Sequence, residues 1–73
     1  MKVKIRLDTF NQAKAFSEVV SSIPNKVFIT DNNGLVVNGK SLLGALHAME
    51  FSELWCTSEK DVYNVIEKFV VIE

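Results

Sequence analysis

The sequence predicts a two-layer α+β domain, in which three helices cover one face of a four-stranded antiparallel sheet. Three observations lead to this fold class. Residues 2–7 alternate between basic and apolar side chains, residues 10–23 repeat apolar side chains at helical spacing, and Asn32-Asn33-Gly34 is a strong hairpin turn. The expected order of elements is β-α-β-β-α-β-α, and the 73 residues allow a single domain, 1–73.

The first expected element is a strand over residues 2–7 with one buried and one basic face. Its apolar side chains are Val3, Ile5 and Leu7, and its basic side chains are Lys2, Lys4 and Arg6. The simpler interpretation of the three cations is a solvated strand face, and a surface for an acidic partner is the alternative.

The next element is a helix from Phe10 to about Ser22. Thr9 is a suitable N-cap, and Gln12 three positions later completes a capping box. Pro24 cannot continue the helix. The apolar residues that define its buried face are Ala13, Phe16, Val19, Val20 and Ile23.

Two strands joined by the Asn32-Asn33-Gly34 turn follow, over residues 26–31 and 35–37, and Asn38-Gly39 ends the second of them. A second helix, of two to three turns, then begins at Ser41. Leu42, Leu43 and Leu46 are spaced 0, 1 and 4, so at least one of them should stay near the surface. We expect Leu43 and Leu46 in the core, with Leu42 at either place.

The last elements are a fourth strand around Leu54-Trp55-Cys56 and a third helix that Ser58 is expected to cap. Cys56 should be a buried, inert thiol, and an exposed Trp55 would indicate an interface. Val62, Val65, Ile66 and Phe69 form the apolar stripe of the third helix. A ferredoxin-like β-α-β-β-α-β domain with an added helix is the competing topology, and the element order does not separate the two.

Composition excludes several classes of function. The formal net charge is −1, so no overall field favours nucleic acid or an anionic membrane. The single cysteine excludes an internal disulfide and most zinc frameworks. No apolar run approaches the length that spans a bilayer, and no signal peptide opens the chain. We therefore expect a cytoplasmic protein with no cofactor, no metal, no nucleic-acid partner and no membrane partner.

The run Gly39-Lys40-Ser41-Leu42-Leu43-Gly44-Ala45-Leu46 resembles the start of the second helix in HPr, the histidine-containing phosphocarrier family of the sugar phosphotransferase system. The resemblance implies an HPr-like open-faced sandwich and a regulatory phosphorylation site at Ser41. It also implies protein partners such as phosphotransferase components, an HPr kinase or a transcription regulator. The docking patch expected around this helix consists of Lys40, Leu42, Leu43, Leu46 and His47.

One departure from the family limits this resemblance. The family has its phosphoacceptor histidine at the start of the first helix, in a Gly-x-His-x-Arg-Pro motif, and here Thr9 occupies that place. The sole histidine, His47, lies at the end of the second helix, where the helix dipole favours the cation and weakens the nucleophile.

These patterns favour a non-catalytic regulatory or protein-binding module, and we expect no catalytic residues and no enzyme activity. The family includes such a relative, the catabolite-repression HPr-like protein, which lacks the histidine and keeps the serine. Two alternatives remain open, namely a functional phosphocarrier and a structural or oligomer-forming module unrelated to sugar transport. Ser41 itself has two interpretations, a helix cap alone or a cap that is also phosphorylated.

Overall fold

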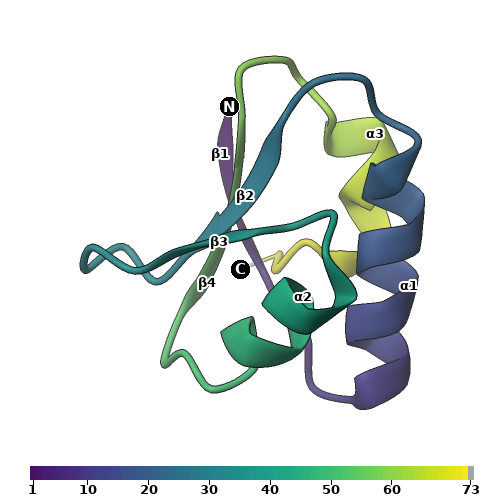
Figure 1. Ribbon diagram of the computed structural model, residues 1–73. Helices are drawn as coiled ribbons and strands as arrows, with labels where there is room; N and C mark the ends of the chain where they lie inside the picture. The colour runs from purple at the N-terminus through teal and green to yellow at the C-terminus, as the bar shows by residue number, and fades with distance from the viewer. Residues whose placement is uncertain (73) are drawn as a thin grey trace.

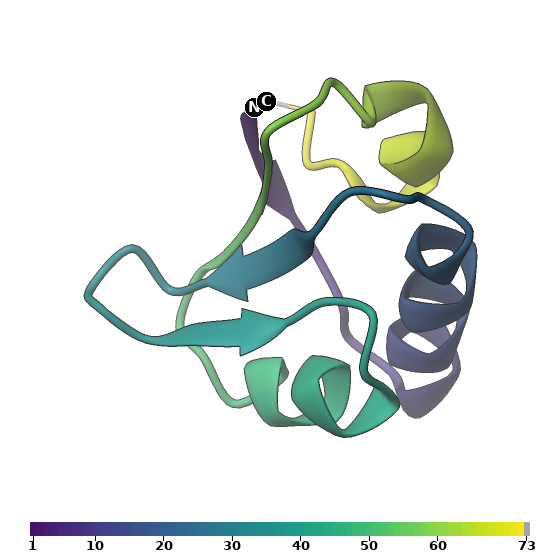
Figure 2. The same cartoon turned by 45° about the horizontal axis from the view of Figure 1, so that its top comes forward.

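The computed structural model describes residues 1–72, which form the expected α+β fold (Figure 1). The strands are β1 (Lys2–Ile5), β2 (Val27–Thr30), β3 (Val36–Asn38) and β4 (Leu54–Ser58). The helices are α1 (Phe10–Ser21), α2 (Leu42–Ala48) and α3 (Tyr63–Ile66), and the 3-10 helix η1 (Glu67–Phe69) continues from α3. Figures 1 and 2 show the three helices gathered on one side of the sheet.

The order of strands in the sheet is β1-β4-β2-β3, and all three pairings are antiparallel. In this order β4 lies between β1 and β2. A ferredoxin-like topology would instead place β3 there, so the strand order excludes the competing topology. The HPr-like open-faced sandwich with three helices on one face is therefore confirmed.

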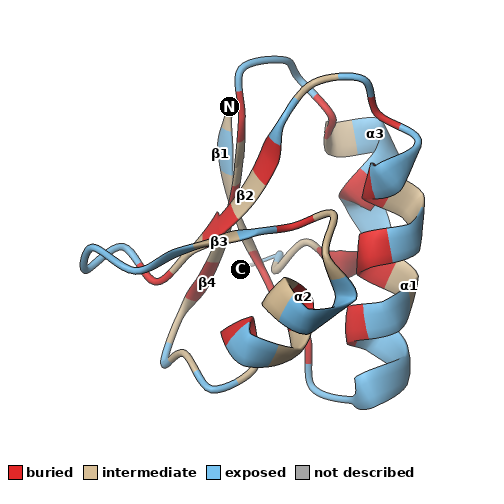
Figure 3. Cartoon of the chain, viewed as in Figure 1, coloured by how far each residue is buried: buried red, intermediate tan, exposed pale blue. Residues whose placement is uncertain are grey.

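The core lies between the helices and the inward face of the sheet (Figure 3). Strand alternation sends Ile29 and Cys56 inward, and neither is exposed to solvent. The ring of Phe16 on α1 meets that of Phe69 edge to face, with centroids 5.3 Å apart, and this contact joins α1 to η1. Such aromatic pairs add about 0.5–1.5 kcal/mol to the burial of their area.

The β2–β3 hairpin turns through residues with positive φ, as its sequence predicts. Asn32 has φ of 68° and Gly34 has φ of 107°, and residues without a large side chain tolerate this geometry best. Asp31 accepts backbone hydrogen bonds from Asn33 and Leu35 through its Oδ1, at 2.7 and 3.0 Å. These bonds hold Leu35 in the turn, and β3 therefore begins one residue later than predicted.

The expected cap of the third helix is wrong. Ser58 is the last residue of β4, where it pairs with Val27, and its N–H donates to the carbonyl of Met1 at 3.1 Å. The helix begins only at Tyr63, whose N–H donates to Asp61 Oδ1 at 3.0 Å. Strand pairing on both sides of β4 thus takes Ser58 away from the helix.

The apolar stripe predicted for this helix is correct except at one position. Val62, Ile66 and Phe69 are buried, whereas Val65 is 40% exposed. The four-residue α3 tightens into the 3-10 helix η1, so the spacing of a regular α-helix does not hold through Phe69.

The two edges of the sheet differ. Over Lys4–Arg6, the outer edge of β1 is covered by the segment after η1. Arg6 donates its N–H to the carbonyl of Phe69 at 2.9 Å, and Val71 donates to the carbonyl of Lys4 at 3.0 Å. On the opposite edge, β3 has no further strand beside it within residues 1–72.

Candidate functional site around the start of α2

Ser41 is the N-cap of α2, as predicted. Its backbone is extended, with φ of −91° and ψ of 127°, and its Oγ accepts the N–H of Gly44 at 3.2 Å. The N–H of Ser41 donates to the carbonyl of Asn38 at 3.2 Å. Since a serine Oγ can accept one of the N–H groups left unpaired in the first turn, these contacts explain Ser41 as a structural cap.

Lys40 reaches toward α1 rather than across Ser41. Its Nζ donates to the carbonyl of Ile23, and its own carbonyl accepts the hydroxyl of Ser21 at 3.3 Å. The backbone N–H of Lys40 donates to Asn38 Oδ1 at 2.9 Å. The ammonium group therefore stabilises the chain just beyond the C-terminal end of α1.

Close packing explains two glycines in the run from Gly39 to Leu46. A Cβ on Gly44 would lie 2.4 Å from the carbonyl oxygen of Asn38, a distance that atoms do not tolerate. A Cβ on Gly39 would lie 3.1 Å from the carbonyl oxygen of Val27 and 3.3 Å from the ring of Phe16. The first turn of α2 and the loop before it can approach β3, β2 and α1 because both positions lack a side chain.

The expectation that Leu43 lies in the core is wrong, since this side chain is 77% exposed. Leu46 is half-buried and packs against the core, and Leu42 is 38% exposed. The fully buried residues of α2 are Ala45 and Ala48, whose small side chains allow the helix to pack closely. The large apolar side chains at the start of the helix are consequently displaced toward solvent.

His47 is exposed near the end of α2, and its ring lies 6.1 Å from the ring of Phe51. Within residues 1–72, its side chain forms no hydrogen bond and no ion pair. Nothing there resembles a phosphoryl site, which needs cationic or N–H donors around the bound anion.

Thr9 caps α1 through the complete predicted capping box. Its Oγ1 accepts the N–H of Gln12 at 3.1 Å, and Gln12 Oε1 accepts the N–H groups of Thr9 at 3.2 Å and of Asp8 at 2.6 Å. The nearby guanidinium of Arg6 lies 3.9 Å from the carboxylate of Asp8. The capping box thus engages the N–H groups of Asp8, Thr9 and Gln12, and the carboxylate of Asp8 lies beside the cation of Arg6 near this helix end.

Thr9 and Ser41 lie toward opposite ends of α1. Lys40, next to Ser41, contacts Ser21 at the C-terminal end of that helix, whereas Thr9 precedes its N-terminal end. A helix of twelve residues is about 18 Å long at 1.5 Å per residue. The fold therefore gathers Lys40, Leu42, Leu43, Leu46 and His47 around α2, with Thr9 at a distance from Ser41.

Cys56 is buried at the centre of the sheet, as expected for an inert thiol. Burial raises the pKa of this thiol to about 11, so the reactive thiolate is disfavoured at neutral pH. Residues 1–72 contain no group of three or more His, Cys, Asp or Glu side chains that could hold a metal ion.

Sequence reasoning gave no role to several exposed apolar side chains. Phe10 is 53%, Leu35 56% and Val36 58% exposed. No periodicity distinguishes such residues from buried ones, because each lies at an element end or on an edge strand. Their exposure follows from the sheet order and from the helix starts.

No protein-family model, no curated protein and no solved structure matches this chain. None of the helices in residues 1–72 has the length and apolar character needed to cross a membrane. The geometry of the α2 region must therefore support any functional conclusion.

Proposed function

We propose that this chain is a non-catalytic protein-binding module of HPr-like type, which docks a partner through α2. The docking surface, called the α2 patch, consists of Lys40, Leu42, Leu43, Leu46 and His47. One observation carries the proposal: Leu43, two residues after the Ser41 cap, is 77% exposed. Placing a leucine of this kind in an apolar pocket gains about 1.5–3 kcal/mol, which is enough to anchor a small interface.

The proposed switch is phosphorylation of Ser41. A phosphate on its Oγ adds nearly two negative charges beside two exposed leucines, and it replaces the hydroxyl that now caps Gly44. An apolar patch would thereby become a mixed apolar and anionic surface. The competing interpretation is that Ser41 only caps the helix.

The absence of a phosphoacceptor at α1 supports a module that does not transfer phosphate. Thr9 and Gln12 hydrogen-bond to each other's backbone N–H groups in the capping box. His47 lies on α2 instead of at the start of α1. The partners that fit this proposal are phosphotransferase components, an HPr kinase or a transcription regulator, and the proposed location is the cytoplasm.

The switch is tested by incubating the chain with an HPr kinase and ATP and measuring intact mass and peptide masses. We expect one added phosphate on Ser41 and none in the Ser41→Ala variant. A genuine HPr, treated in parallel, shows that the kinase is active. An unmodified Ser41 beside a fully modified HPr would remove the switch.

The docking surface is tested by measuring the affinity of the same kinase, without ATP, for matched variants. Leu43→Glu should weaken binding by at least about tenfold, because one buried leucine contact is worth more than 1.4 kcal/mol. Leu35→Glu changes an equally apolar residue in the β2–β3 turn, 56% exposed, and should bind as the parent does. Equal affinity of both variants would contradict docking through α2.

The phosphocarrier alternative is tested with enzyme I and labelled phosphoenolpyruvate. We expect no acid-labile label on the chain, since no imidazole stands at the start of α1. Label that His47→Ala abolishes would overturn the non-catalytic assignment.

A second candidate function, an oligomer-forming module, is favoured by the open edge of β3 and by exposed Leu35 and Val36 beside it. Light scattering during size-exclusion chromatography distinguishes this candidate. A dimer that Val36→Lys converts to a monomer would favour it, and a monomer at all concentrations would exclude it.

A further inference from the structure

The face of the sheet opposite the helices combines aromatic and cationic side chains, and no helix covers it (Figure 2). Because side chains alternate along a strand, the neighbours of the buried residues point to this face. It is called the open face here and includes Lys2, Lys4, Phe28, Thr30, Trp55 and Thr57.

Its two aromatic side chains stand on the two central strands. Phe28 on β2 is paired with Thr57, and Trp55 on β4 is paired with Thr30. The two residues are therefore diagonal neighbours on adjacent strands, and the Cα atoms of such pairs are about 7–8 Å apart. Both residues are only half-buried. An uncovered antiparallel sheet with aromatic side chains on its central strands is a platform on which bases of a single strand can stack.

Lysine side chains surround this platform. The Nζ of Lys2 lies 5.2 Å from the centroid of the Trp55 ring, and that of Lys4 lies 6.0 Å from it. Lys4 also approaches Glu53 at 3.8 Å, and Lys2 donates to Asn32. Because the stems of these side chains are flexible, their ammonium groups can move off the indole to bind phosphate oxygens and leave the ring to a base.

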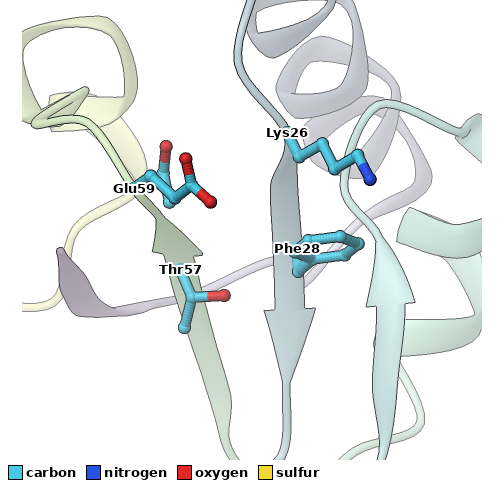
Figure 4. Close-up of a pocket in the computed structure, with 5 residues that line it drawn as sticks. Lys26, Phe28, Thr57 and Glu59 are labelled. Atoms are coloured by element: carbon cyan, nitrogen blue, oxygen red, sulfur yellow. The ribbon is translucent and has the colours of Figure 1, made fainter.

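A hollow of about 250 Å³ continues the platform at the other end of the face. Its walls include Lys26, Phe28, Thr57 and Glu59 (Figure 4). Phe28 lies on β2, and Lys26 directly precedes that strand. Thr57 lies on β4, and Glu59 directly follows it. The hollow thus offers an aromatic wall, a cation and a hydroxyl within the reach of one nucleotide, with the carboxylate of Glu59 on the side where a base rather than a phosphate would have to lie.

The indole of Trp55 is also an unsatisfied donor. Its Nε1 is buried and has no hydrogen-bond partner in the described part of the chain. An unpaired buried N–H costs about 1–3 kcal/mol, so an acceptor brought to it by a ligand is favoured. The flexible stems of Lys2 and Lys4 lie beside this ring and can move at little cost.

We propose that the open face binds single-stranded nucleic acid, with bases on Phe28 and Trp55 and phosphates at Lys2, Lys4 and Lys26. The formal net charge of −1 describes the whole chain, and the charges are not evenly distributed. On and around the open face, three lysines stand beside two carboxylates, those of Glu53 and Glu59. An acidic peptide without aromatic residues could pair with the lysines but has no flat rings to stack on the two aromatic side chains. The site lies on the face opposite α2, so its failure would leave docking at the α2 patch untouched.

The test uses the fluorescence of Trp55, the only tryptophan of the chain. Titration with oligo(dT) and with oligo(U) of about ten nucleotides should quench this fluorescence at low salt, since one such module covers about 4–16 nucleotides. Three phosphate contacts predict a slope of about −2 for log affinity against log salt. Tighter binding of one oligonucleotide shows whether the face prefers DNA or RNA, and either preference supports the proposal.

Matched variants separate stacking from general attraction, with binding followed by anisotropy of a labelled oligonucleotide. Phe28→Leu keeps apolar bulk and should weaken binding about tenfold, the loss expected for one stacked base. Lys26→Gln should lower the salt slope by about 0.7. Lys14→Gln on α1 is the control, since it removes an exposed lysine away from the open face, and it should bind as the parent does.

Three outcomes would overturn the proposal: no change in fluorescence or anisotropy, equal affinity of Phe28→Leu and the parent, or equally tight binding of poly-glutamate. Thermal melting of each variant confirms that it is folded at the temperature of the titration.

Discussion

The N-terminal ends of α1 and α2 are capped by similar residues but differ in what surrounds the cap. At α1, Thr9 and Gln12 satisfy each other, and a single exposed apolar side chain, Phe10, follows the cap before the polar Asn11 and Gln12. At α2, Ser41 makes one capping bond, Gly44 presses against Asn38, and exposed leucines follow at once. A cap therefore says little about function by itself, and the neighbouring side chains distinguish a closed helix end from a surface that can dock.

The largest effect that separates the two ends should come from Gly44→Ala. In an exposed helix this change stabilises by about 1 kcal/mol. Here the new Cβ would lie 2.4 Å from the carbonyl oxygen of Asn38, so we expect destabilisation by about 2–3 kcal/mol. Urea unfolding followed by circular dichroism measures the change. A variant as stable as the parent would show that α2 is not tightly packed at its start.

Thr9→Ala should have the next largest effect, a loss of about 1 kcal/mol, because it removes the hydroxyl that accepts from Gln12. Thr9→Ser keeps the hydroxyl and should retain most of the stability. The same urea experiment applies to both. Equal losses in the two variants would indicate that the methyl group of Thr9, rather than its oxygen, matters.

Ser41→Ala should cost less, about 0.5 kcal/mol. The seven-residue α2 depends chiefly on burial of Ala45 and Ala48, so its cap contributes a smaller share of its stability than the capping box contributes to α1. Amide hydrogen exchange at Gly44 should become faster in this variant while exchange in α1 is unchanged. Global destabilisation as large as that of Gly44→Ala would contradict this view of α2.

Leu43→Ala should leave stability within about 0.5 kcal/mol of the parent, because a side chain that is 77% exposed contributes little to folding. Ala45→Leu on the same helix is the contrasting variant and should be strongly destabilising, since Ala45 has no exposed surface. A large loss from Leu43→Ala would remove the argument that this residue is kept for a partner.

Much of the fold could be predicted because local chemistry determined it. Alternation along residues 2–7, the capping box at Thr9 and the turn at Asn32 to Gly34 each correspond to one backbone geometry; the box and the turn are present, and the strand is present over Lys2–Ile5, two residues shorter than predicted. The order of strands could not be derived from local pattern, since two topologies share the same element order. Tertiary pairing of β4 with both β1 and β2 decides between them.

The candidate site was predicted less well than the fold. Its residues could be named from the run at 39–46 and the histidine that follows it. The exposure of Leu43 could not be predicted, because large apolar side chains are ordinarily assigned to a core. In α2 the small residues Ala45 and Ala48 occupy that place. The position of Ser58 was misjudged for a related reason, since cap chemistry is also compatible with the last residue of a strand.

The segment that lies along the outer side of β1 has a consequence for assembly. It covers the outer edge of β1 over Lys4–Arg6, whereas within residues 1–72 no strand or segment pairs with the outer edge of β3, so β3 is the more accessible place for another chain to extend the sheet. Two copies joined there through a two-fold axis would present no further unpaired strand, whereas fibre growth needs a free strand at each end of every copy. Pairing through β3 would therefore favour a closed pair of chains over a growing fibre.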